Sequence, residues 1–165
     1  MPGWMVLIAV VAAISGGAAA ARAQRPAEPA NLKTFDFGLD GVRYRVALPA
    51  GATLMARSGS DRFHISLSTR MLRQMELWPA SAETGRTYAR SQSLANGAVL
   101  TFEVMRPSSA YRGGSGGPEE TLEGQMRIGG RTLAVRCHDQ AEWPGSPRPT
   151  WCIDYLQHLV VQDGR

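Results

Sequence analysis

Three turn dipeptides, each flanked by residues that alternate between apolar and polar, constrain the fold of this chain more than any other feature. They are Asp40-Gly41, Asn96-Gly97 and Gly129-Gly130. A two-residue type I′ turn needs positive φ at both central positions, and Asn, Asp and Gly adopt that conformation most readily. Alternation at period two gives a strand one buried and one exposed face. The sequence therefore predicts three antiparallel hairpins.

These hairpins and the shorter strands beside them define the expected fold class. The hairpins are predicted at residues 34–48, at 86–94 with 98–105, and at 122–137. Further strands are predicted at 53–57, 63–67 and 151–161. The chain is therefore expected to be mainly β, and to fold as an antiparallel β-sandwich or barrel of about eight short strands.

Residues 68–78 are the one segment where helix and strand compete. Four apolar residues recur there at helical spacing: Leu67, Met71, Leu72 and Met75. Ser68 or Thr69 could cap the N-terminus of a helix, and Pro79 would end it. We therefore expect one short helix near 68–78. A strand is the alternative for this segment, and α+β is the alternative fold class.

The N-terminus has the features of an export signal. An unbroken apolar run over residues 4–14 is too short to span a bilayer but has the length of a signal-peptide core. Residues 21–23 then fit the small-x-small pattern that signal peptidase accepts. We predict cleavage between Ala23 and Gln24, with a cut after Ala21 as the alternative. No Lys or Arg precedes the apolar run, which leaves an uncleaved anchor open.

This cut defines the expected organisation of the chain. Residues 1–23 form the signal peptide, 24–33 a flexible leader rich in Ala and Pro, and 34–165 a single β-rich domain. The Gly-rich segment 106–119 is expected to be a long loop. The mature protein is predicted to be periplasmic or secreted, with no membrane span.

The two cysteines, Cys137 and Cys152, are expected to form a disulfide, because an exported protein folds in an oxidising compartment. Their bond would join two consecutive strands across the Pro-rich loop 142–150. Their spacing differs from the C-x-x-C motif of redox enzymes, so we expect a structural role.

Charge and motifs exclude several function classes. The formal net charge is +4, but the basic residues are scattered singly, so no nucleic-acid partner is expected. His64, His138 and His158 show no H-x-x-x-H spacing, and neither a metal nor a cofactor is expected. The chain also lacks a P-loop and a dinucleotide-binding fingerprint.

Two groups of residues resemble catalytic patterns. Residues 113–117 match G-x-S-x-G, but a nucleophile elbow needs a strand before the serine and a helix after it, and neither is predicted. Glu119, Glu120 and Glu123 cluster beside the Gly-rich loop. A hydrolase could use Glu119 or Glu123 with Asp139 or Asp154, provided that these acids line one cleft. We expect solvated acids and no catalytic residues.

The Pro-rich loop carries the best candidates for partner binding. Trp143, Arg148 and Trp151 lie in or beside it, and Trp and Arg are over-represented at interface hot spots. The alternative is that Trp151 packs in the core and Trp143 covers the hairpin.

The expected function is a non-catalytic binding module for an envelope or secreted protein, of inhibitor or immunity type. A periplasmic carrier of a small ligand or lipid inside a β-barrel is the alternative, and an envelope hydrolase is a further one. Residues 46–51 and 128–131 resemble the strand-Pro-x-Gly and Gly-Gly-Arg pieces of bacterial periplasmic proteins with a PsbP-like sandwich. No function is inferred from these two short pieces.

Overall fold

The computed structural model describes residues 31–56, 62–67, 72–80, 86–106, 117–141 and 146–162. Within these residues the fold is mainly β, as predicted, with ten antiparallel strands in two sheets. The strands are β1 (Leu32–Leu39), β2 (Val42–Pro49), β3 (Thr53–Ala56), β4 (Phe63–Ser66), β5 (Leu72–Pro79), β6 (Arg90–Ser93), β7 (Val99–Met105), β8 (Glu119–Ile128), β9 (Arg131–Gln140) and β10 (Val160–Gln162). A short 3-10 helix, η2 (Pro149–Cys152), leads directly into α1 (Ile153–Leu156).

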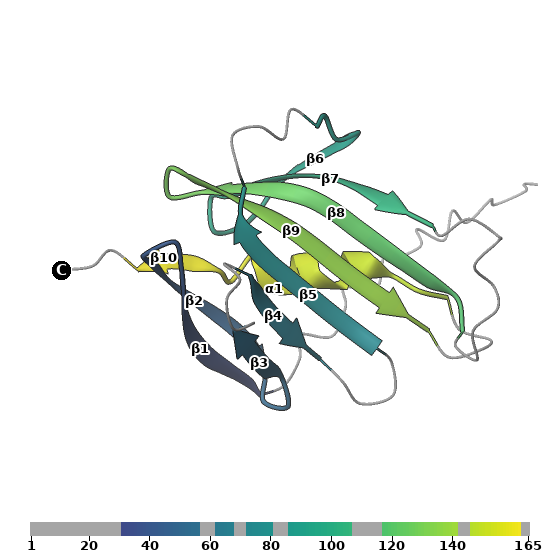
Figure 1. Cartoon of the computed structure of the whole chain (residues 1–165), viewed down its shortest axis with the longest axis horizontal. Coiled ribbons are helices and arrows are strands. Elements are labelled where there is room, and N and C mark those ends of the chain that lie inside the picture. Colours follow the sequence, from purple (N-terminus) through teal and green to yellow (C-terminus); the bar gives the residue numbers. More distant parts are fainter. Residues whose placement is uncertain are drawn as a thin grey trace, which may run out of the picture.

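The two sheets differ in size and are packed together. The larger one has the order β3-β4-β5-β9-β8-β7-β6, and the smaller one has the order β1-β2-β10. The large sheet is open at both edges, β3 and β6, so among the described strands the architecture is two packed sheets and not a closed barrel. Figure 1 shows the long strands β5, β9 and β8 crossing the molecule, with β1, β2 and β10 at one end.

All three predicted hairpins form, and two have the expected turn. Asp40-Gly41 joins β1 to β2 with φ of 48° and 69°, and Gly129-Gly130 joins β8 to β9 with φ of 54° and 73°. The turn at Asn96-Gly97 is different, because only Gly97 has a positive φ. Leu94 N–H donates to the Ala98 carbonyl, which makes a three-residue turn.

Asn96 does not adopt a left-handed backbone conformation, and its side chain makes the hydrogen bonds that hold the turn. Its amide nitrogen donates to the carbonyls of Leu156 at 2.9 Å and Leu159 at 2.6 Å. Its amide oxygen accepts from Ala98 N–H. The turn between β6 and β7 is thereby tied to the C-terminal end of α1, where helical carbonyls otherwise lack partners.

The predicted helix near 68–78 is wrong where the structure describes it, because residues 72–79 form strand β5. Met75 and Leu77 are fully buried and alternate with half-buried neighbours, which is the period of a strand. β5 pairs with β4 on one side and with β9 on the other, and these hydrogen bonds override the helical spacing of the apolar residues. Residues 68–71 lie outside the described part.

The C-terminal segment corrects a second prediction. A strand was expected at 151–161, but residues 149–156 are helical and only Val160–Gln162 extends the small sheet. Pro149 at the start of η2 suits a helical first turn, since its missing N–H would have no partner there. Within the described residues, the helical elements η2 and α1 therefore lie in this segment.

The core lies between the two sheets and is sealed at one end by η2 and α1. Phe37 of β1 stacks on Phe63 of β4 with ring centroids 4.0 Å apart, so the aromatic contact joins the two sheets directly. Leu156 and Leu159, from α1 and the residues after it, are fully buried in the same cluster. Among the described residues, the inner face of the large sheet is thus covered by the small sheet, η2 and α1.

Gly124 sits where two strands of the large sheet approach most closely. A Cβ atom at this position would lie 2.4 Å from the Thr101 carbonyl oxygen and 2.9 Å from Phe102 Cβ. Gly124→Ala should therefore lower the free energy of unfolding by about 1–3 kcal/mol, the usual cost of overpacking.

Gly38→Ala is the matched control, because Gly38 is also a strand residue and an added Cβ would make only one ordinary contact, at 3.9 Å. Its stability should change by no more than about 0.5 kcal/mol. Urea denaturation followed by circular dichroism measures both variants. Equal stability of the two would contradict the close approach.

Candidate functional site

Strand β9 and the end of η2 are joined by the predicted disulfide. Cys137 and Cys152 are bonded, with Cα atoms 6.3 Å apart, and both residues are fully buried. This separation lies within the normal range for a disulfide. The bond joins a strand to a helix, not two strands as the sequence suggested, and it closes the loop that contains residues 142–148.

A buried carboxylate holds the same loop. Asp139 is 1% exposed and is the one buried charged residue among those described. Its Oδ2 accepts the backbone N–H of Arg148 at 2.6 Å, and its Oδ1 accepts Nε of Arg73 at 3.3 Å. Because a buried carboxylate is costly without such partners, these two bonds fix where the chain re-enters the fold before η2.

Trp151 packs under the loop. Its side chain is 7% exposed, its ring N–H donates to the His138 carbonyl at 3.4 Å, and its ring meets Tyr155 edge to face. The guanidinium of Arg73 lies 5.9 Å from the Trp151 ring. Trp151 therefore occupies the core position that the sequence left open as the alternative.

The other two predicted partner-binding residues are Arg148 and Trp143. Arg148 is exposed, and its ordering comes from its backbone bond to Asp139. Trp143 lies outside the described residues. The geometry thus gives a segment, residues 148–152, that is fixed to β9 by a disulfide, a buried carboxylate and a tryptophan.

The outer face of the large sheet carries a row of charges that runs across five strands. The register places His64, Glu76, Arg136, Glu123 and Glu103 side by side on β4, β5, β9, β8 and β7.

Ion pairs join the members of this row. Arg136 reaches Glu123 at 2.9 Å and Glu76 at 3.6 Å, and His64 lies 3.5 Å from Glu76. Glu103 and Glu123 are like charges directly opposite each other, which destabilises a sheet. Arg86 offsets this repulsion by pairing with both carboxylates.

The acids proposed for a hydrolase do not share a cleft. Glu123 is on the outer face of the sheet and is paired with arginines, whereas Asp139 is buried on the inner face. Asp154 is exposed on α1. Carboxylates on opposite faces of a sheet cannot act on one bond, so the pair of Glu123 with Asp139 is excluded.

The remaining chemical motifs give no site in the described part. Glu119 lies 3.7 Å from His138 and Glu120 pairs with Arg106, so both acids have surface partners. Among the described residues no group of three or more His, Cys, Asp or Glu side chains could hold a metal ion. The G-x-S-x-G match falls outside the described residues, apart from Gly117.

No helix in the described ranges is long and apolar enough to cross a bilayer.

The fold and the site together define a class of protein. This chain forms a small domain of two packed sheets, with residues 148–152 fixed to β9 and with paired charges on its outer face. Its candidate catalytic acids are held apart. These are features of a rigid binding module.

A comparison with protein-family models identifies the family. The type six secretion immunity 3 domain (Tsi3) matches residues 45–160, which is more than half of the chain. The chain belongs to this family of immunity proteins, which confirms the predicted non-catalytic binding role of immunity type. A comparison with curated proteins gave no match.

The disulfide should contribute measurably to stability. Replacing Cys137 and Cys152 together by Ala removes a link between residues 15 apart, for which the chain-entropy model gives about 3 kcal/mol. The thermal midpoint should fall by about 6–12 °C at this chain length. Thermal unfolding by circular dichroism, with and without dithiothreitol, measures the effect. Dithiothreitol should lower the midpoint of the natural protein and leave that of the double variant unchanged; a midpoint that neither treatment alters would contradict the role given to the bond.

Proposed function

We propose that this protein is exported to the periplasm and neutralises one cognate effector toxin of type six secretion by binding it. Membership of the immunity family supports the toxin as partner. The disulfide supports export, since such bonds form and persist in oxidising compartments. The apolar run and the small residues at positions 4–23 supply the corresponding signal.

We further propose that the toxin contacts the loop between β9 and η2. The observation that carries this proposal is the fixation of residues 148–152 to β9, with the Arg148 side chain left exposed. A segment that is held in place before binding loses less conformational entropy on association, which favours affinity. Arg148 and Trp143 are of residue types that dominate hot spots, and buried Trp151 holds η2 close to Arg148.

The loop is tested by the double variant Trp143→Ala/Arg148→Ala. The exported protein, tagged at its C-terminus, is used to capture proteins from the producing cells, and a captured candidate counts as the toxin only if its export to the periplasm stops growth. The double variant should bind that toxin at least about 100-fold more weakly, as expected for two hot-spot residues.

Arg43→Ala is the matched control, because Arg43 is an exposed arginine on β2. It should bind normally. Arg43→Ala and the single variant Arg148→Ala should keep the thermal midpoint of the natural protein, because both arginines are exposed. Unchanged binding by the double variant would show that the toxin docks elsewhere, for example on the charged outer face of the large sheet.

Localisation is tested through the N-terminus. The mass of the protein recovered from the periplasmic fraction should correspond to a chain that begins at Gln24. Cells that produce the toxin in the periplasm should survive with the full chain and should die when the protein is made from Gln24 without its signal. Protection by the form without a signal would contradict action in the periplasm.

A further inference from the structure

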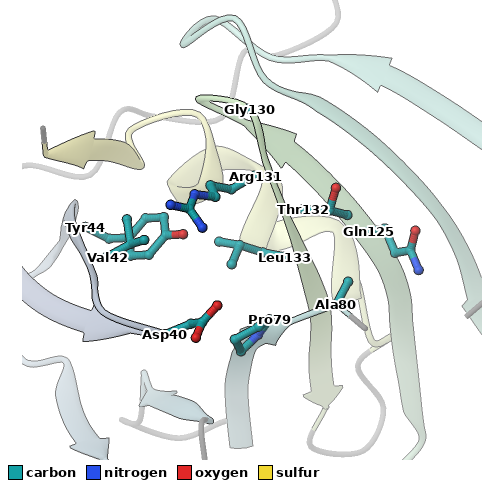
Figure 2. Close-up of a pocket in the computed structure, with 10 residues that line it drawn as sticks. All are labelled: Asp40, Val42, Tyr44, Pro79, Ala80, Gln125, Gly130, Arg131, Thr132 and Leu133. Carbon is teal, nitrogen blue, oxygen red and sulfur yellow. The ribbon is translucent and has the colours of Figure 1, made fainter. Parts of the chain in front are cut away.

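A cavity of about 440 Å³ lies between the tips of two hairpins, away from the loop just described. Its walls come from the β1–β2 turn at Asp40, from β2 at Tyr44, and from the start of β9 at Arg131, with the end of β5 closing it. Figure 2 shows these side chains converging on the space between the two sheets. The volume is within the range of cavities that hold small molecules.

Tyr44 directs its hydroxyl into this cavity, where the oxygen remains open to solvent. The residue is 2% exposed, yet its hydroxyl points into the space and makes no hydrogen bond to any residue that the structure describes. Burial raises the pKa of the Tyr44 phenol, an effect that Arg131 opposes and Asp40 reinforces. The phenol is therefore a protonated donor at neutral pH, without a protein acceptor among the described residues.

The cavity walls also carry one charge of each sign. The Arg131 guanidinium and the Asp40 carboxylate approach the Tyr44 hydroxyl from different turns, as Figure 2 shows. Within the described part of the chain neither charge forms an ion pair, with the other or with any third residue. Two opposite charges on exposed residues and a hydroxyl thus face one space, each free to bind a ligand that displaces water.

Both charged walls are held in place by backbone geometry. Asp40 has φ of 48° in a type I′ turn, and Arg131 follows the turn at Gly129-Gly130. A Cβ on Gly129 would lie 2.8 Å from Val161 of β10, so the β8–β9 turn rests tightly against the small sheet. This contact fixes the two hairpin tips relative to each other, and the groups that line the cavity are preorganised.

We propose that this cavity binds a small zwitterion, an α-amino acid, whose carboxylate contacts Arg131 and the Tyr44 hydroxyl and whose ammonium group contacts Asp40. A guanidinium and a hydroxyl are the donors that bind carboxylates well, and a carboxylate is the natural partner of an ammonium group. A simple anion would be repelled by Asp40, and a simple cation by Arg131. Only a ligand with both charges satisfies all three groups.

This site is independent of the proposed toxin-binding loop. The cavity is at the turn of the β8–β9 hairpin and the loop begins at its other end, ten residues along each strand. Ten residues of strand span about 33 Å. Variants at one site should therefore leave the other unchanged, so failure of either proposal can be recognised separately.

The test is a titration of the exported protein with glycine and L-alanine, followed by nuclear magnetic resonance and by calorimetry. Acetate and methylammonium are the controls that carry one charge each. Saturable binding of the amino acids, with binding of acetate and methylammonium at least about 10-fold weaker, is the expected result. Tyr44→Phe, which removes only the hydroxyl, and Arg131→Gln should each weaken amino-acid binding about 10-fold or more.

Asp40→Asn separates a zwitterion site from an anion site, since Asn tolerates the left-handed turn conformation as well as Asp does. It should weaken glycine binding and strengthen acetate binding. Arg43→Ala and the loop double variant should bind glycine normally. No saturable binding of either amino acid, equal binding of acetate, or unchanged binding by both Tyr44→Phe and Arg131→Gln would overturn the proposal. Arg131 is exposed, so its variant keeps the test decisive if Tyr44→Phe fails to fold.

Discussion

The pairing of β9 with β5 on one side and β8 on the other is the interaction on which the rest of the structure depends. These ladders make β9 a central strand of the large sheet, with no open edge and with one face toward each side of the sheet. On the inner face its alternate residues, Leu133, Val135, Cys137 and Asp139, are all buried. The disulfide, the carboxylate that orders Arg148 and the carbonyl that accepts the Trp151 N–H all belong to this one strand.

The same alternation explains why this fold binds rather than catalyses. A period of two sends successive side chains of β9 to opposite faces, so Arg136 and His138 join the surface charges while Cys137 and Asp139 join the core. Acids that are close in sequence are thereby separated by the thickness of the sheet. The carboxylates on the outer face pair with arginines and form part of a charged surface. This separation agrees with the immunity family, whose members act as binders.

The parts of the fold that could be predicted from the sequence are those with local causes. Asp40-Gly41 and Gly129-Gly130 specify their turns because positive φ is a property of the residues themselves. The disulfide followed from the count of cysteines and the predicted compartment. Strand β5 could not be predicted in this way, because Met71, Leu72 and Met75 fit a helix and only the hydrogen bonds from β4 and β9 decide between the two structures.

The candidate sites also include features with local causes, which the sequence predicts, and features that exist only in the folded chain. Trp143 and Arg148 could be singled out from residue type and from their place in a Pro-rich loop. The contact of Asp139 with the Arg148 backbone could not be predicted from the sequence, because the burial of this carboxylate depends on the folded sheet. The cavity between the hairpin tips was missed for a stronger reason: Asp40, Tyr44 and Arg131 come from two sheets, and no spacing in the sequence relates them. The one available signal was that both hairpin turns are immediately next to charges, at Asp40 and at Arg131.

The arrangement of these sites has a mechanical consequence. The β8–β9 hairpin has the fixed segment 148–152 at one end and the charged cavity at the other, and both ends are fastened to a second layer. At the loop end the fastening is the disulfide to η2, and at the turn end it is the contact of Gly129 with Val161. A hairpin held at both ends has few alternative conformations, so the described residues at its two ends keep their positions. An immunity protein gains from such rigidity, because little free energy is then lost in ordering its surface when the toxin binds.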